Sequence, residues 1–273
     1  MRVEKIIPVV TLASDWHAKE VVQVTERRKR WYEVTCHDEV NEEQIAVRLP
    51  SVTTVLDKVY PRPALTNWAA KKSRDGVRDW LLPHVGEPLT VSLLDDAVEK
   101  GGKLAAKKES SAARDLGTLA HTMIDEYLRG RTQWEDSEDS DELRPVMQAF
   151  LDWKGSQDLK LVDTECAVYF THPDHPTHGY AGQVDALWEK PDGSLLLTDW
   201  KTSKAVYDNY HTQLAAYGAA LTWLAPVRGV NVNMEIIRLG KEEAEFEAVP
   251  VIEIDKHVEI WRAALDFYAA LQQ

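Results

Sequence analysis

The sequence has few cysteines and no long hydrophobic run, and each of these absences excludes a class of protein. Two cysteines, Cys36 and Cys166, occur in 273 residues, which is too few for a disulfide framework or a four-cysteine metal cluster. The longest nearly apolar stretch, Leu214 to Val227, is interrupted by a glycine and a proline and is too short to span a bilayer. We therefore expect a cytoplasmic protein without a membrane segment.

Positive charge is also scarce. The chain has 32 Lys and Arg against 45 Asp and Glu, a formal net charge of −13, which argues against a general polyanion binder. With 44% hydrophobic and 28% charged residues the composition is that of a globular protein with a sizeable core. Nucleic-acid binding would therefore need basic residues that cluster locally.

The order of predicted elements places helices before most of the strands. Periodicity and turn residues predict a hairpin over residues 31–49 and a mainly helical stretch up to 153, interrupted at Gly101-Gly102. Strands are predicted over residues 159–170, 179–189, 194–201, 230–239 and 244–251, and helices over 206–224 and 253–271. We predict one α/β domain over residues 1–273, with a hairpin and helical elaboration in 1–109 and a core with a central mixed β-sheet in 110–273.

A carboxylate and an ammonium group stand side by side at the end of an apolar strand. Asp199 and Lys201 project to one face of the predicted strand 194–201. Asp185 lies on the preceding strand, and a hairpin would bring it close to Asp199. Two carboxylates at that range repel unless a hard cation lies between them, which predicts Mg²⁺ or Mn²⁺. Lys201 would then orient or deprotonate the attacking water and balance charge on a phosphate.

A lone Asp-x-Lys pair is more often a surface ion pair, so neighbouring motifs decide its interpretation. His121 follows Gly117 by four residues on a predicted helix, where a single histidine is more often a satisfied core residue than a ligand. Gln213 and Tyr217 share one helix face and could both hydrogen-bond a bound strand.

The ordered set of these motifs resembles the RecB-like branch of the PD-(D/E)XK nucleases over about residues 110–220. The set comprises Gly117-x-x-x-His121, Glu165, Gly182-x-x-Asp185, Asp199-x-Lys201 and Gln213-x-x-x-Tyr217. The resemblance implies a restriction-endonuclease-like core. The N-terminal segment Ser51 to Leu56 and the region of Trp68 also resemble phage-type and mitochondrial genome maintenance exonucleases of this branch.

The resemblance implies a role for each matching residue. His121, Asp185 and Asp199 would be metal ligands, with the Trp200 backbone carbonyl as a further ligand and Lys201 as the catalytic lysine. Gln213 and Tyr217 would correspond to the helix motif of the catalytic site. Glu165 is either a further ligand, a residue that supports the ligands, or an exposed strand glutamate. Iron–sulfur members of the branch carry four cysteines, so we expect no iron–sulfur cluster.

Basic and aromatic residues gather in the predicted N-terminal helices. Residues 60–114 contain ten basic and seven acidic side chains, so this segment is positive within an acidic chain. The predicted DNA-binding residues are Trp68, Lys71, Lys72, Arg74, Arg78, Lys103, Lys107 and Lys108. Such a mixture suits a groove that stacks bases and follows phosphates, although a solvated helix face with buried tryptophans has the same composition.

Three other segments have two interpretations each. Arg27 to Arg30 is a second basic cluster, with a nuclear-type signal as its alternative. His172, His175 and His178 suggest zinc, but without a regular ligand spacing a plain turn is favoured. The acidic residues within 135–142 indicate a solvated loop that faces away from DNA.

These observations predict a metal-dependent DNA exonuclease that hydrolyses phosphodiester bonds in recombination, repair or DNA end processing, with a phage origin among the expectations. The alternatives are a structure-selective endonuclease with the same site and a catalytically silent DNA-binding subunit of a recombination complex. The expected partners are DNA, as single strands or duplex ends, and a recombination annealing protein or a helicase, because the chain has no GxxxxGK[ST] motif of its own.

Overall fold

The computed structural model describes residues 2–7, 18–26, 29–38, 43–61, 63–134, 141–171, 179–224 and 231–272. The histidines His172, His175 and His178 and residues 135–140 of the acidic segment lie outside these ranges. The chain divides into two compact units, one of Met1–Tyr60 with Ala120–Gln273 and one of Pro61–Leu119. Among the helices of the described residues, none is both long enough and apolar enough to cross a membrane.

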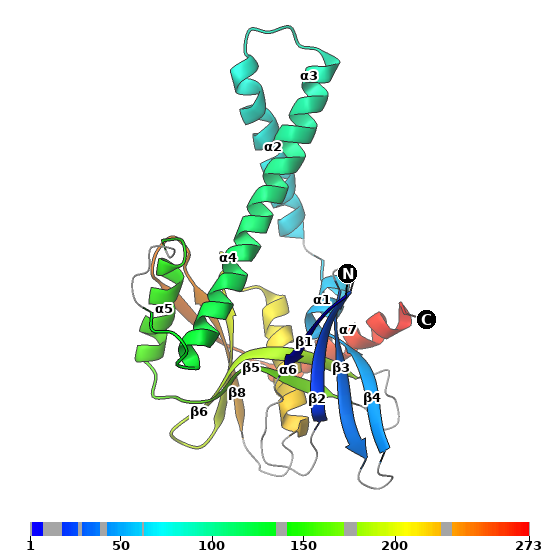
Figure 1. Ribbon diagram of the computed structural model, residues 1–273, viewed down its shortest axis with the longest axis vertical. Coiled ribbons are helices and arrows are strands. Elements are labelled where there is room, and N and C mark those ends of the chain that lie inside the picture. The colour runs from blue at the N-terminus through cyan, green and yellow to red at the C-terminus, as the bar shows by residue number, and fades with distance from the viewer. Residues whose placement is uncertain are drawn as a thin grey trace. The chain divides into compact units, whose positions relative to one another are not determined.

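The larger unit is built on a five-stranded mixed sheet of order β5-β6-β7-β8-β9. Figure 1 labels β5, β6 and β8 of this sheet. The central strand β7 is antiparallel to β6 and parallel to β8. The strands are β5 (Lys160–Phe170), β6 (Tyr180–Glu189), β7 (Leu195–Lys201), β8 (Val232–Leu239) and β9 (Phe246–Pro250). The predicted α/β core with a central mixed sheet flanked by helices is therefore confirmed.

Helices cover both faces of strand β7, which explains its continuous apolar sequence. On one face, Leu195 and Leu197 join a core with α6 (Asp208–Leu224) and α7 (Ile254–Ala270). On the other face, the Trp200 ring lies 5.1 Å from the Trp153 ring of α5 (Arg144–Gly155). Burying aromatic side chains of this size stabilises the fold by about 2–3 kcal/mol each.

A second sheet precedes this core. Its four antiparallel strands are β1 (Arg2–Ile7), β2 (Ala18–Glu26), β3 (Lys29–Asp38) and β4 (Glu43–Pro50). The β3–β4 pair confirms the predicted hairpin, whereas β1 and β2 were not predicted. The signal for β2 was its run of β-branched residues, in which Val21 and Val24 are fully buried. Tyr32 and Val34 of β3 pack in one cluster with Ala167 of β5.

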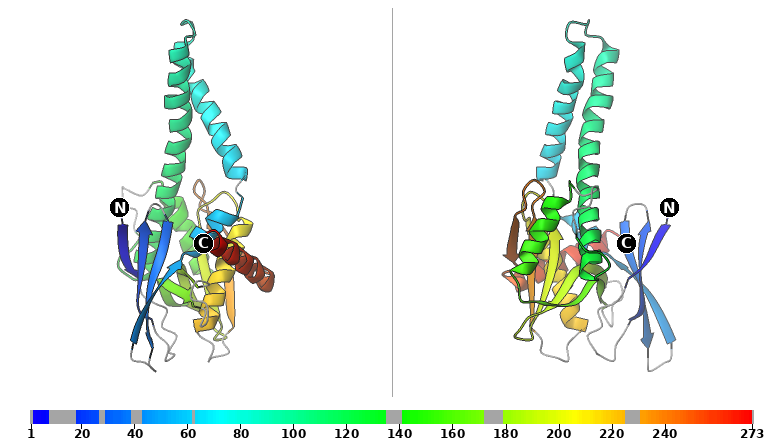
Figure 2. Two further views of the ribbon diagram at one scale, coloured as in Figure 1. Left: turned by 90° about the vertical axis from the view of Figure 1, so that its right-hand side faces the viewer. Right: turned by 60° about the vertical axis from the view of Figure 1, so that its left-hand side comes forward.

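A short helix, α1 (Val52–Val59), follows the second sheet as predicted. Its first turn is closed by Ser51, whose side chain accepts a hydrogen bond from the Thr54 N–H at 3.0 Å. Ser51 also forms a parallel bridge with Ala181 of β6. The bridge joins the start of α1 to the sheet of the core. Figure 2 shows the strands of the second sheet, in shades of blue, beside the core from two further sides.

The smaller unit, Pro61–Leu119, is a pair of helical arms. Its elements are α2 (Pro63–Leu81), the 3₁₀ turn η1 (Leu82–His84), α3 (Val91–Asp96), the π-helix η2 (Ala97–Lys103) and the first part of α4 (Leu104–Leu128). The predicted interruption at Gly101-Gly102 is a π-helical turn, so the chain stays helical through the glycines. Gly101 lies against Gly76 and Trp80 of α2, which places two backbones in close contact.

We expect Gly101→Ala to loosen this helix pair. A Cβ at position 101 would lie 2.6 Å from the Gly76 carbonyl oxygen and 2.7 Å from the Trp80 Cβ, and a clash with backbone costs roughly 1–3 kcal/mol. Hydrogen exchange of residues 61–119 should become faster. Gly155→Ala is the matched control, because a Cβ there meets nothing within 4 Å. Equal exchange in the two variants would contradict the packing.

Candidate metal and catalytic site

The site begins where two paired strands separate. The ladder between β6 and β7 ends at Ala186 and Thr198. Beyond that pair, the Trp200 N–H donates a hydrogen bond to Asp185 Oδ2 at 2.7 Å in place of a backbone carbonyl. The side chain of Asp185 therefore occupies the gap where the two strands diverge.

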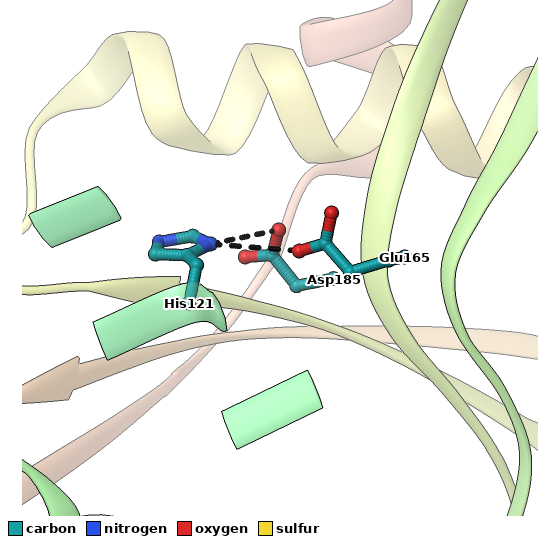
Figure 3. Close-up of side chains that lie close together, drawn as sticks. All are labelled: His121, Glu165 and Asp185. Atoms are coloured by element: carbon teal, nitrogen blue, oxygen red, sulfur yellow. Dashed lines mark ion pairs between the residues drawn. The ribbon is translucent and has the colours of Figure 1, made fainter. Parts of the chain in front are cut away.

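A histidine from α4 completes one cluster of possible metal ligands (Figure 3). Buried Ala120 and Ile124 fix the last part of α4, and His121 points from the same helix toward β6. Its Nδ1 lies 3.2 Å from Asp185 Oδ1 and 4.0 Å from Glu165 Oε1. One ligand atom from each of the three residues lies within 4.8 Å of the others. An imidazole and two carboxylates at this spacing fit a divalent cation.

Glu165 has an unusual backbone for a strand residue. Its φ of 49° is left-handed, a conformation that costs a non-glycine residue on the order of 1–3 kcal/mol. The Gln183 side-chain amide donates to the Glu165 carbonyl at 2.9 Å and so holds this conformation. The strain directs the Glu165 side chain toward His121 and Asp185, which favours a metal-binding or supporting role over an exposed strand glutamate.

A second cluster lies beside the first one, around Asp199. Lys201 Nζ forms an ion pair with Asp199 Oδ2, and the Gln213 amide donates to Asp199 Oδ1 at 3.0 Å. The same amide lies 3.3 Å from the Tyr217 hydroxyl. The Tyr217 ring packs directly on Gly182, where any Cβ would clash. Thus Gln213 and Tyr217 brace Asp199 from one face of α6.

Burial and mutual attraction shift the pKa values of the ligand cluster. Burial lowers the pKa of His121, but the charge and hydrogen bond of Asp185 outweigh it and raise the pKa to about 9. Burial raises the pKa of Asp185, yet His121 and Lys201 bring it below the usual value. Without a metal, His121 and Asp185 therefore form an ion pair at neutral pH.

The pKa values of Asp199 and Lys201 are shifted as well. Burial and repulsion from Asp185 raise the pKa of Asp199 to about 6, although Lys201 opposes this shift. Burial lowers the pKa of Lys201, but the charges of Asp199 and Asp185 outweigh it and raise the pKa. Lys201 is therefore a cation at neutral pH, which suits it to stabilise negative charge more than to accept a proton.

The structure groups the predicted ligands in part. His121, Asp185 and Glu165 form the compact set, and Asp199 engages Lys201 and Gln213 instead. The Trp200 N–H points to Asp185, and because the N–H and C=O of a strand residue face the same edge, the Trp200 carbonyl faces that side too. Asp199 and the Trp200 carbonyl lie outside the compact set, and their role as metal ligands stays a prediction.

Sequence reasoning missed three residues that support the cluster. Thr164 Oγ1 donates to the Asp185 carbonyl at 2.8 Å, and Gln183 holds Glu165. Arg129, on the turn after α4, donates to the Thr164 carbonyl at 2.6 Å and to Asp125 at 2.8 Å. Gln183 stands inside the Gly182-x-x-Asp185 motif, but nothing local in the sequence marks Thr164 or Arg129.

The predicted DNA-binding residues all belong to the smaller unit, Pro61–Leu119. Trp68 is half-buried there, while Lys71, Lys107 and Lys108 are exposed. Four of the predicted cations already have acidic partners within the unit. These pairs are Lys72–Glu109, Arg74–Asp75, Arg78–Asp79 and Lys103–Glu99. Exposed pairs of this kind contribute little stability, so phosphates could replace the carboxylates at small cost.

Three comparisons relate the chain to known proteins. The sequence profile of the PD-(D/E)XK nuclease superfamily matches residues 97–270. No curated protein matches the chain significantly. Nineteen chains of solved structures match. Among them is the crystal structure of SSO0001, with 13% identity and a TM-score of 0.34 over 74% of this chain and 86% of that chain.

We expect Mn²⁺ binding to release a proton from His121. A ligating imidazole must be neutral, and with a pKa of about 9 in the metal-free protein the proton must be displaced below that pH. Affinity should therefore rise by up to about tenfold per pH unit between pH 6.5 and 8.5, as titration calorimetry at several pH values would measure. His121→Gln should flatten this dependence and His211→Gln should preserve it. A dependence that both variants retain would remove His121 from the ligand set.

Proposed function

Because the chain belongs to the PD-(D/E)XK nuclease superfamily, we propose that it is a metal-dependent DNA exonuclease of the RecB-like branch. The observation that carries the proposal is the convergence of His121, Glu165 and Asp185 beside the Asp199–Lys201 pair. The set combines possible metal ligands with a partly buried cation, the groups that phosphodiester hydrolysis requires. Recombination, repair or DNA end processing is the proposed context, and the proposed type is a phage-type or mitochondrial genome maintenance-like exonuclease.

The chain's own residues would perform distinct tasks. His121, Asp185 and Glu165 would hold Mg²⁺ or Mn²⁺, with Asp199 and the Trp200 carbonyl as further ligands. The cation, when bound, supplies Lewis acidity toward the phosphate and lowers the pKa of water. Lys201 would place its ammonium group against the charge that develops on the phosphate, and Asp199 would hold that ammonium in position.

Gln213 and Tyr217 would hold the Asp199–Lys201 pair in position. The Gln213 amide fixes Asp199 Oδ1, and the Tyr217 hydroxyl is within hydrogen-bond range of the same amide. Because Gln213 is nearly buried, its contact with Asp199 is shielded from water and restricts the carboxylate to one orientation. The helix motif is thereby proposed as a support for the catalytic lysine as well as a contact for DNA.

DNA is the proposed partner, with the exposed cations of the smaller unit as its binding residues. Trp68 would stack on bases, and Lys71, Lys107 and Lys108 would contact phosphates. The predicted protein partner is a recombination annealing protein or a helicase.

Digestion of end-labelled DNA tests the proposed activity directly. With Mg²⁺ or Mn²⁺ we expect release of nucleotides from linear DNA and none from circular single strands, because an exonuclease requires an end. EDTA should abolish the activity, since the carboxylates alone would repel the phosphate. Cleavage of circles would instead identify an endonuclease, and full activity in EDTA would exclude the metal-dependent mechanism.

Lys201→Ala should impair the chemical step and spare binding. Loss of the ammonium should lower single-turnover cleavage by two or more orders of magnitude, about 3 kcal/mol of transition-state stabilisation. DNA affinity measured with Ca²⁺ should stay within a few fold. Lys204→Ala is the control, because Lys204 is an exposed lysine three residues further on. A variant that loses affinity but cleaves normally in single turnover would assign Lys201 to binding.

A further inference from the structure

An arginine ends the buried face of strand β3. Side chains two residues apart share a face of a strand, so Arg30 stands on the same face as Tyr32 and Val34. Those two side chains are fully buried against the core, whereas Arg30 is exposed. The inner face of the second sheet thus changes from apolar to cationic at the end where the sheet meets α1.

The backbone of Arg30 is fixed in place by buried hydroxyl and amide groups. Its N–H donates to Thr54 Oγ1 at 3.2 Å, and Thr54 Oγ1 donates to its carbonyl at 3.1 Å. The Ser51 N–H donates to the same carbonyl at 3.3 Å. Ser51 and Thr54 are themselves almost inaccessible to solvent. An exposed guanidinium on such a rigid base loses less freedom when it binds a ligand.

A short chain of contacts leads from Arg30 to the catalytic cluster. This cluster comprises the ligand set His121, Glu165 and Asp185 together with the Asp199–Lys201 pair. Ser51 bridges Ala181, and the next residue, Gly182, lies under the ring of Tyr217. Tyr217 in turn contacts Gln213, the residue that holds Asp199. Burial raises the pKa of Tyr217 while the Arg30 guanidinium opposes the shift, in keeping with a short separation.

A polyanionic substrate would gain from a cation beyond the metal ion and Lys201. Glu165, Asp185 and Asp199 are carboxylates, and the ammonium of Lys201 is already held by Asp199. Within the described part of the chain, no carboxylate forms an ion pair with Arg30. A guanidinium presents several N–H donors in a planar fork that fits two phosphate oxygens.

We propose that Arg30 is a substrate-binding residue that takes a backbone phosphate of the DNA strand entering the catalytic cluster. This inference rests on the proposed nuclease function and assigns the second sheet a part in holding the substrate. The contact would involve hydrogen bonds from the guanidinium to two phosphate oxygens and no covalent step. Arg30 would therefore contribute to affinity and to the alignment of the strand.

Arg30→Ala tests the proposal against a matched variant of the same sheet. Arg48 of β4 stands directly opposite Glu33 of β3 in the strand register. Its side chain therefore lies on the opposite face of the sheet from Arg30. There its guanidinium carbon lies 5.0 Å from the centroid of the Trp31 ring. With a single-stranded oligonucleotide in Ca²⁺, Arg30→Ala should weaken binding roughly tenfold. The slope of log Kd against log salt should fall by about 0.7, the loss of one phosphate contact. Arg48→Ala should change neither quantity.

Two further measurements separate binding from folding and from catalysis. Mn²⁺ affinity of Arg30→Ala should equal that of the wild type, and Arg30→Lys should restore part of the DNA affinity and the salt slope. Equal effects of Arg30→Ala and Arg48→Ala, or an unchanged salt slope, would overturn the assignment, as would loss of Mn²⁺ binding. If the wild type cleaves no DNA but Arg30→Ala still lowers affinity and slope selectively, the nuclease function fails and the phosphate contact stands.

Discussion

The carboxyl group of Asp185 connects three elements, and the rest of the site depends on that connection. Its Oδ2 accepts the Trp200 N–H of β7 and its Oδ1 lies 3.2 Å from His121 on α4. The carbonyl of the same residue accepts the Thr164 hydroxyl of β5. A buried carboxylate is costly unless it is paired and hydrogen-bonded, so these contacts hold it in a single position. The separation of β6 from β7 leaves the room that Asp185 occupies.

The same constraint explains why the predicted catalytic residues form two adjoining groups. His121, Glu165 and Asp185 gather in front of the separated strands, whereas Asp199 faces α6 with Lys201 and Gln213. Asp185 lowers the tendency of Asp199 to ionise, and Lys201 opposes that effect. A divalent cation would relieve the repulsion between the two carboxylates. The arrangement therefore carries unbalanced negative charge whose natural partner is a metal ion.

Much of the fold was predictable because its signals are local. The apolar sequence of β7 predicted a central strand, and the polar stretch 37–43 between two β-rich runs predicted the β3–β4 hairpin. Ser51 predicted the start of α1 through its capping hydroxyl. Strands β1 and β2 were not recognised, although β2 pairs with β3, the strand that follows it closely in the sequence, and β1 pairs with β2. Intrinsic strand preference is too weak to decide such a case without the partner strand.

The sequence by itself determined which chemical groups the protein has and how they alternate along each element. Asp199 and Lys201 share a strand face, and Gln213 and Tyr217 share a helix face, because the two-residue and four-residue periods are properties of the local backbone. Only the tertiary structure decided that Glu165 adopts a left-handed backbone and joins His121 and Asp185. It also placed Arg129 on the Thr164 carbonyl and anchored Arg30 to α1. Those contacts join residues 20 to 64 positions apart, and no local pattern encodes distances between segments that meet only after folding.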